Sequence, residues 1–251
     1  MAVTLEVSGV GKDFLIPVID SVSFTVEAGE FVCVLGPNGC GKTTLLRIVG
    51  GLEPPTRGRV LLGGEPVAGS GRHTKKVGVV FQEDRLLPWM TLRQNVELVL
   101  IPLGVDADAR RAAADRYLRL AGLGGFEDYY PARVSGGMRQ RAAIARALAI
   151  EPDLLLMDEP FGALDAQNRR IMQTEVRRIW RETGRTILFV THAIDEAVAI
   201  GTTLIMLSAR PSRIRVQVRN DGQRDRATLV DDLNALIMEE VERQQGASSA
   251  S

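Results

Sequence analysis

The chain has 251 residues, of which 45% are hydrophobic and 25% are charged, as in ordinary globular proteins. Basic and acidic residues number 31 each, so the net charge is zero and the basic excess typical of nucleic-acid-binding proteins is missing. No apolar run reaches 18 residues, the first seven residues do not resemble a secretion signal, and Cys33 and Cys40 favour free thiols over a disulfide.

The hydrophobic pattern predicts an α/β fold. Alternating residues predict half-buried antiparallel strands over 5–10 and 22–26, and a strand returns at 59–62. Apolar runs predict buried strands over 31–35, 77–81, 154–158, 186–191 and 203–207, and a last strand covers 214–218. Helices are expected over 44–49, 91–100, 106–120, 135–149, 165–182, 194–199 and 227–243. Buried strands alternating with helices indicate a parallel core with an antiparallel β flank, and the helical block 88–150 indicates an inserted lobe.

A glycine-rich segment between the strand 31–35 and the following helix fits the phosphate-binding pattern G-x-x-x-x-G-K-[ST]. It consists of Gly36, Pro37, Asn38, Gly39, Cys40, Gly41, Lys42 and Thr43, and Thr44 is grouped with it as nucleotide-binding. Glycines let backbone N–H groups surround an anion, and a helix N-terminus adds partial positive charge. Lys42 is expected to reach the β- and γ-phosphates, and the Thr43 hydroxyl is expected to ligate Mg²⁺. The sequence therefore predicts ATP and Mg²⁺ as cofactors.

Two adjacent carboxylates, Asp158 and Glu159, end the apolar strand 154–158. A carboxylate at this end of a strand can hold Mg²⁺, and its neighbour can take a proton from the attacking water. We expect Asp158 to serve the metal and Glu159 to serve as the general base. The alternative is a solvated acidic pair on a loop.

The segment Val134–Arg141 reads Val-Ser-Gly-Gly-Met-Arg-Gln-Arg and resembles the Leu-Ser-Gly-Gly-Gln signature of ABC transporter nucleotide-binding subunits. It departs from that signature at Val134 and Met138, whereas Ser135, Gly136 and Gly137 are retained. The resemblance implies a P-loop NTPase (RecA-like) fold over residues 3–218, with a C-terminal helix and disordered tail over 219–251. It also implies that Ser135, Gly136 and Gly137 bind the γ-phosphate held by a second copy of the chain.

Four further residues match family positions, in the order that the resemblance requires. Phe14 matches the aromatic residue that stacks on adenine, although an ordinary core phenylalanine is the alternative. Gln82 matches the glutamine that reaches Mg²⁺ or water, and His192 matches the histidine that hydrogen-bonds the γ-phosphate. Asp165 matches a residue that crosses to the second subunit, or simply caps a helix. His73 lacks such a context and is expected to be a solvated loop residue.

The resemblance also implies partners. Two copies are expected to pack head to tail around two ATP molecules, on the cytoplasmic face of the inner membrane. They would drive a multi-span permease and, indirectly, an extracytoplasmic solute-binding protein, without nucleic acid. Leu86, Leu87 and Trp89 either form an apolar groove for the permease or cover the core of the helical lobe.

Three segments, 82–89, 135–141 and 207–211, together resemble the nitrate/sulfonate/taurine importer branch. Aliphatic sulfonate, taurine or nitrate is therefore the expected solute. The alternatives are another small solute such as a pyrimidine precursor, an exporter, or an ABC-type ATPase uncoupled from transport. The arginines near the C-terminus are expected on a solvated strand face or near lipid headgroups, namely Arg210, Arg213, Arg215 and Arg219.

Overall fold

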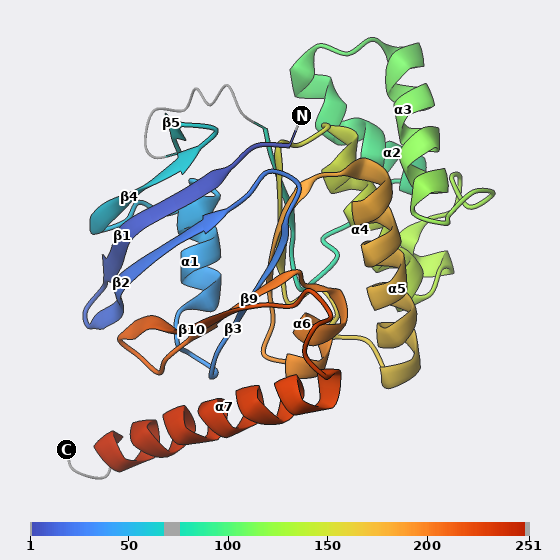
Figure 1. Cartoon of the computed structure of the whole chain (residues 1–251). Coiled ribbons are helices and arrows are strands. Elements are labelled where there is room, and N and C mark those ends of the chain that lie inside the picture. Colours follow the sequence, from blue (N-terminus) through green and yellow to red (C-terminus); the bar gives the residue numbers. More distant parts are fainter. Residues whose placement is uncertain (1, 68–75, 249–251) are drawn as a thin grey trace. The chain divides into compact units, whose positions relative to one another are not determined.

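The computed structural model describes residues 2–67 and 76–248, and the chain divides into two compact units. Unit 1 combines Met1–Lys75 with Thr186–Ser251, and unit 2 spans Lys76–Arg185. Figure 1 shows the strands and helices of both units. His73, expected in a solvated loop, lies outside the described residues.

Unit 1 is built on a mixed sheet. Its strands are β1 (Leu5–Asp13), β2 (Pro17–Val26), β3 (Phe31–Leu35), β4 (Arg57–Leu62), β5 (Glu65–Pro66), β8 (Thr186–Val190), β9 (Thr203–Leu207) and β10 (Ser212–Arg219). They lie in the order β5-β4-β1-β2-β10-β9-β3-β8. β3 pairs in parallel with β8 and β9, whereas β1 pairs antiparallel with β2 and β4. The predicted parallel core and antiparallel flank are both confirmed.

The buried strands follow directly from their apolar runs. Every residue of β3, β8 and β9 is buried, which matches continuous apolar sequence. β2 is longer than the alternation indicates, because it begins at Pro17 rather than at residue 22. Val18 and Ile19 are both buried, and the β1–β2 register shifts between Val10 and Lys12 and again before Asp13. Such irregularities interrupt the period of two on which the prediction relied.

The described part of unit 1 contains the helices α1 (Lys42–Val49), α6 (Ile194–Ile200) and α7 (Arg226–Ser248). α1 packs against β8, α6 packs against β3, and α7 packs against α6. Leu229 and Leu233 of α7 are buried. The helix continues to Ser248, five residues past the predicted end at 243 and into the small-polar segment expected to be disordered.

Unit 2 contains a parallel pair of strands, β6 (Val77–Val80) and β7 (Leu154–Asp158). Its helices are α2 (Leu92–Glu97), the 3₁₀ helix η1 (Leu98–Leu103), α3 (Ala107–Leu120), η2 (Pro131–Arg133), α4 (Gly136–Ala149) and α5 (Ala166–Thr183). α2, α3 and α4 pack on one another, α4 also contacts β6, and α5 packs on α4. The block 88–150 is therefore helical, as the pattern predicts.

The helix starts in unit 2 lie where side-chain caps predict them. Thr91 accepts a hydrogen bond from the Gln94 N–H in a capping box, and Asp106 accepts one from the Ala109 N–H. The helix predicted over 91–100 is shorter than expected, because α2 ends at Glu97 and a 3₁₀ helix follows. Pro102 explains this ending, since its ring opposes the carbonyl four residues earlier and its nitrogen donates no hydrogen bond.

Among residues 2–67 and 76–248, no helix is both long enough and apolar enough to cross a membrane.

Candidate nucleotide-binding site

The P-loop of unit 1 holds a buried lysine at the start of α1. Lys42 is 5% exposed, and its Nζ donates hydrogen bonds to the carbonyl oxygens of Gly36 and Pro37, each at 3.0 Å. The ammonium group therefore lies within the curve of the loop, beside the N–H groups of the first helical turn. A lysine charge and a helix N-terminus at one place form a strong site for a phosphate anion.

Two glycines of this loop are required by geometry. Gly41, the N-cap of α1, has φ of 103°, and a Cβ there would lie 2.9 Å from Cγ1 of Val18. A Cβ on Gly36 would lie 2.8 Å from the Cys40 Sγ and 3.0 Å from the Leu207 carbonyl oxygen. Side chains at either position would force the loop away from β2 or β9.

Cys40 packs beneath the loop and is 1% exposed. Burial raises the pKa of its thiol, and the nearby charges of Lys42 and Arg210 oppose that rise. Burial also raises the pKa of Cys33, and both cysteines are free, as predicted. A buried, protonated thiol fills space in the loop and is a poor nucleophile.

Phe14 lies in the turn between β1 and β2, and its side chain is 57% exposed. The Lys12 Nζ lies 4.8 Å from the centroid of its ring. The core alternative for Phe14 is therefore wrong. The exposed ring lies at one end of strands in the same sheet as β3, which leads into the P-loop, and it is available to stack on a planar base.

His192 follows β8 directly and is exposed. The preceding residue fixes its turn, because Thr191 Oγ1 donates to Glu196 Oε2 at 2.7 Å and accepts from the Ala193 N–H at 3.0 Å. Glu196 is 4% exposed, so this contact is buried. Sequence reasoning missed Glu196, and the only signal was an acidic residue in the first turn of a short apolar helix.

In unit 2, the carboxylates at the end of β7 lie in the same unit as Gln82. Glu159 has φ of 45°, a left-handed conformation that is uncommon for a residue with a side chain. A Cβ on Gly162, three residues further on, would lie 3.1 Å from the Gln82 Nε2. The structure therefore brings Gln82 to the loop that follows Asp158 and Glu159. Strained backbone of this kind concentrates at functional sites.

The signature segment forms the N-terminus of α4. Ser135 is its N-cap and accepts a hydrogen bond from the Met138 N–H at 3.2 Å, and Ser135 and Gly136 are exposed. The N-terminus of α5 lies nearby, since a Cβ on Gly137 would lie 3.8 Å from the Asn168 Oδ1. Two helix N-termini of the same unit thus face one region.

Asp165 caps α5, as one of the two interpretations predicted. Its Oδ1 accepts from the Asn168 N–H at 2.9 Å, and its Oδ2 accepts from the Asn168 side-chain amide at 2.6 Å. These hydrogen bonds hold the pKa of Asp165 below its ordinary value. The capping role does not exclude a contact with a second copy.

Side chains of α4 hold the segment that follows Gln82. Arg139 Nε donates to Asp84 Oδ2 at 3.0 Å, and Gln140 Nε2 donates to the Phe81 carbonyl at 3.3 Å. Arg146 donates to the carbonyls of Asp84 and Arg85, at 2.8 and 2.7 Å. The signature helix and the segment after Gln82 are therefore one hydrogen-bonded assembly, which the sequence pattern did not reveal.

A buried amide fixes the next part of the same segment. Asn95 is fully buried, accepts from the Leu87 N–H at 2.7 Å and donates to the carbonyls of Leu87, Met90 and Thr91. Leu86 is buried, whereas Trp89 is 69% exposed. The core alternative is therefore right for Leu86, whereas Trp89 faces outward from a rigid loop and the groove for a permease stays a prediction.

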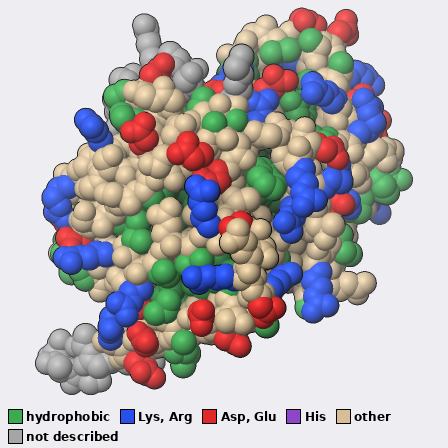
Figure 2. Space-filling model, viewed as in Figure 1, with side chains coloured by type: hydrophobic (Ala, Val, Ile, Leu, Met, Phe, Trp, Pro, Cys, Tyr) green, Lys and Arg blue, Asp and Glu red, His purple; other side chains and the backbone are tan. Residues whose placement is uncertain are grey.

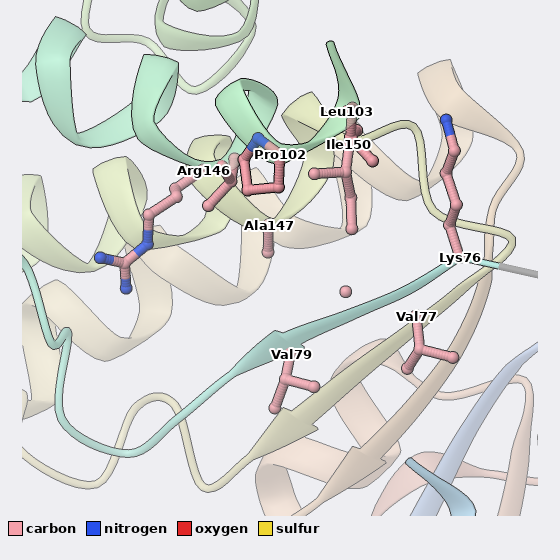
Figure 3. A pocket seen from close by; sticks show the side chains of 10 residues that line it. Lys76, Val77, Val79, Pro102, Leu103, Arg146, Ala147 and Ile150 are labelled. Carbon is pink, nitrogen blue, oxygen red and sulfur yellow. The ribbon is translucent and has the colours of Figure 1, made fainter. Parts of the chain in front are cut away.

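An apolar pocket of about 430 Å³ lies in unit 2 between β6, η1 and the end of α4. In Figure 3, Val77 and Val79 of β6 lie across the pocket from Pro102, Ala147 and Ile150. Its remaining lining residues are Lys76, Gly78, Val99, Leu103 and Arg146. Arg146 also holds the loop that carries Trp89, so the pocket and that loop share one side chain. Sequence reasoning did not identify this pocket.

Two of the four C-terminal arginines are ion-paired rather than simply solvated. Arg213 pairs with Asp20, and Arg215 pairs with Glu239 and Glu240. Figure 2 shows acidic and basic side chains interspersed on the face drawn. This mixed surface agrees with the zero net charge of the chain.

The fold and the P-loop define the class of protein. A glycine-rich loop between a buried parallel strand and a helix, closed around a buried lysine, is the phosphate site of a P-loop NTPase. A family model described as ABC transporter matches residues 19–162, which is more than half of the chain. The chain therefore belongs to the ABC transporter family, and it is an ATP-binding cassette with ATPase activity, as the sequence predicts.

Relatives and solved structures agree with this assignment. The chain is 50% identical to a taurine import ATP-binding protein TauB of Burkholderia pseudomallei, over 78% of this chain and 74% of the relative. It is 46% identical to an uncharacterized ABC transporter ATP-binding protein of Methanocaldococcus jannaschii, over 90% and 85%. A solved dimeric, post-hydrolysis structure of the ATP-binding cassette MJ0796, bound to ADP and Pi, has a TM-score of 0.74 and 31% identity, covering 87% of this chain and 99% of that one.

Proposed function

We propose that this chain is the motor subunit of an ABC importer, which dimerises on ATP and drives a separate membrane permease. The observation that carries the proposal is the P-loop closed around Lys42, in a chain 50% identical to an import ATP-binding protein. The identity supports the importer direction. The loop supports ATP as the energy source.

The expected site residues take the following roles. Phe14 stacks on adenine, and the backbone of Gly36–Thr44 and the Lys42 ammonium bind the phosphates. Glu159 accepts a proton from the water that attacks the γ-phosphorus, while the bond to the β-phosphate oxygen breaks. Gln82 orients that water, and His192 donates a hydrogen bond to the departing phosphoryl group.

The available ligands fit Mg²⁺. Thr43, Gln82 and Asp158 offer oxygen atoms, which this hard cation prefers, and Mg²⁺ usually takes only a few protein ligands beside phosphates and water. Within residues 2–67 and 76–248, no group of three or more His, Cys, Asp or Glu residues could hold a metal without phosphates and water as further ligands. When bound, Mg²⁺ would neutralise phosphate charge during the transfer.

A second copy completes the proposed site. Ser135, Gly136 and Gly137 form an exposed helix N-terminus, and we propose that it binds the γ-phosphate of ATP held by the other copy. Asp165 would cross to that copy from the adjacent helix start. The dimeric state of the solved relative supports this arrangement. Hydrolysis then removes the phosphate that joins the copies, so that they separate.

The permease contact is proposed on the rigid loop that carries Trp89 and on the apolar pocket beside it. Trp89 is exposed although Asn95 fixes its loop from within. Ile101 and Leu103 of η1 are also largely exposed, and Leu103 lines the pocket. Exposed apolar side chains on a fixed backbone are typical of a docking surface for a partner helix. Such a contact would hold the protein at the cytoplasmic face of the inner membrane.

For the solute, we propose taurine or another aliphatic sulfonate, with nitrate next. Relatives named taurine import ATP-binding protein occur at 46–50% identity, and the segments 82–89, 135–141 and 207–211 resemble the same branch. An extracytoplasmic solute-binding protein would deliver the solute to the permease. A pyrimidine precursor is the alternative solute.

The test is a pull-down of the tagged chain from detergent-solubilised native membranes, with partners identified by mass spectrometry. A multi-span permease is expected, and its solute receptor is then titrated with taurine, an alkyl sulfonate, nitrate and a pyrimidine precursor. Trp89→Ala should recover less permease, while Phe126→Ala, a partly exposed aromatic outside that loop, should recover as much as the wild type. Recovery of only soluble proteins, ribosomes or nucleic acid would contradict the transport role.

A further inference from the structure

The hairpin between β9 and β10 lies against the P-loop of the same unit. The Leu207 carbonyl oxygen lies 3.0 Å from the position of a Cβ on Gly36, and the Ser212 Oγ lies 3.7 Å from the position of a Cβ on Gly41. At the tip of the loop, the Arg210 Nη2 lies 3.8 Å from the position of a Cβ on Gly39. The hairpin therefore follows the P-loop along its length, with Arg210 next to its exposed tip.

The hairpin is closed by its own hydrogen bonds. The Ser208 N–H donates to the Arg213 carbonyl at 2.9 Å, and the Arg213 N–H donates to the Ser208 Oγ at 3.0 Å. The Arg213 side chain pairs with Asp20 of β2. The groups of Ser208 and Arg213 named here thus fix the two arms of the hairpin, and none of them is available to a ligand.

α7 holds the hairpin from the other side. Glu240 is 3% exposed, and its Oε2 accepts from the Ala209 N–H at 3.0 Å. Its Oε1 lies 3.4 Å from Arg215 Nε and 3.0 Å from Arg243 Nη1. A buried carboxylate with two cationic partners and a backbone donor is a firm anchor, and it acts on the residue directly before Arg210.

Arg210 differs from these neighbours. Its side chain is exposed, and within residues 2–67 and 76–248 it forms no hydrogen bond or ion pair. An unpaired guanidinium beside the tip of a phosphate loop adds charge where the phosphate chain of a nucleotide would end. Its planar fork suits two phosphate oxygens at once.

We propose that Arg210 is a further nucleotide-binding residue, which contacts the β- and γ-phosphates, and that Glu240 of α7 positions it. This inference rests on the proposed ATP-binding function. It assigns a task to the segment 207–211 and to α7, neither of which the mechanism above uses. The C-terminal helix thereby contributes to nucleotide affinity through one buried contact.

The first experiment measures Mg²⁺-ATP affinity of the purified full chain by isothermal titration calorimetry. Arg210→Gln is expected to weaken ATP binding about tenfold, the loss typical of one charged hydrogen-bonding group. Arg210→Lys should recover part of the loss, and Arg219→Gln, an exposed arginine at the far end of β10, should match the wild type. ADP binding should weaken less, because one charged phosphate is missing.

The second experiment tests Glu240 with a double-mutant cycle. Glu240→Asp keeps the charge but shortens the reach to Ala209, so ATP binding should weaken several-fold, and Glu240→Gln should restore it because the amide oxygen still accepts that N–H. Adding Glu240→Asp to Arg210→Gln should cause no further loss, since both act through one contact. Additive losses would mean that Glu240 acts elsewhere, and would overturn the positioning role.

Two outcomes separate this inference from the proposed function. If the wild type binds ATP and Arg210→Gln binds it equally well, the inference fails while the proposed function stands. The same holds if Arg210→Gln alters only association of two copies, which would place Arg210 at their interface. If the wild type binds no ATP, the proposed function fails first.

Discussion

Helices α1 and α4 both begin at a glycine-rich N-terminus, but the two N-termini are capped differently. At α1 the cap is Gly41 in a left-handed conformation, and Lys42 lies buried within the loop. At α4 the cap is Ser135, whose own side chain satisfies the Met138 N–H, and Gly136 is exposed. Arg139 lies beside this helix start, with its Nη2 3.7 Å from the position of a Cβ on Gly136, but its Nε and Nη1 donate to Asp84 and the Val134 carbonyl.

This difference indicates what each helix N-terminus can bind by itself. The first has a cation, a cradle and backbone donors in one chain, so it can bind phosphate alone. The second has helix N–H groups, a hydroxyl and an arginine that is already paired with Asp84, but no buried lysine, so it contributes only part of an anion site. We therefore expect changes at α1 to abolish nucleotide binding and changes at α4 to spare it. Four predictions test this expectation, from the largest effect to the smallest.

Glu159→Gln should reduce ATP turnover about a thousandfold, within the usual range for loss of a general base. ATP binding should persist, so both helix starts stay occupied and a dimer accumulates. Phosphate release and size-exclusion chromatography with ATP measure the two effects. Glu151→Gln is the matched control, because Glu151 also has a positive φ, of 51°, in the same unit. Normal turnover in Glu159→Gln would refute the assignment.

Lys42→Ala should weaken ATP binding by about ten- to a hundredfold, because the phosphates lose a buried charged donor. Calorimetric titration with Mg²⁺-ATP measures the change. Arg47→Ala, an exposed change on the same helix, should leave the affinity unaltered. Unchanged affinity in Lys42→Ala would show that the P-loop does not bind the nucleotide.

Ser135→Ala should lower turnover about tenfold without changing the ATP affinity of a single chain. Loss of the cap also costs about 1 kcal/mol, or a fall in Tm of about 2–4 °C. Asp106→Ala removes the equivalent cap of α3 and should show the same fall in Tm with full turnover. Weakened ATP binding by isolated Ser135→Ala chains would break the distinction between the two helix starts.

Asp165→Asn should give the smallest effect, a lower Tm at pH 7 that vanishes in acid. The hydrogen bonds from Asn168 lower the pKa of Asp165 in the folded state. The stabilisation is therefore present above the ordinary pKa of about 4 and is lost as pH falls through the lower folded value. Asp225→Asn, at a carboxylate with the same direction of pKa shift, should share this pH profile. Only Asp165→Asn should also reduce turnover, and a difference in Tm that grows in acid would contradict the assignment.

Local patterns predicted the elements well where one physical cause dominates. Five apolar residues in a row located β3, and the caps Ser135 and Asp165 located two helix starts. The shortened helix α2 was also readable in principle, because Pro102 marks where α-helical hydrogen bonding must fail. α7 continues past Arg243 to Ser248, although composition alone pointed to disorder there.

The candidate site was predicted in its parts rather than in its connections. Lys42 is recognisable by the glycine-rich phosphate pattern, and Glu159 and His192 because each lies just after an apolar strand. The supporting residue Glu240 acts across 31 residues of sequence, and no local pattern marks such a contact. Glu196 reaches back only five residues to Thr191, but nothing in the sequence distinguishes it from an ordinary acidic residue in a first helical turn. Nor does any pattern give the left-handed backbone of Glu159, which depends on how the following loop turns.

The buried amide of Asn95 has a practical consequence for the surface above it. Since the path of the loop 87–91 is set from inside the lobe, its outward residues are free to vary without altering that path. The docking specificity of such a protein can then be rewritten at a few surface positions, while the ATP-consuming parts remain untouched. The smallest such change would be a chimera in which only Pro88 and Trp89 are exchanged for the residues of a related protein.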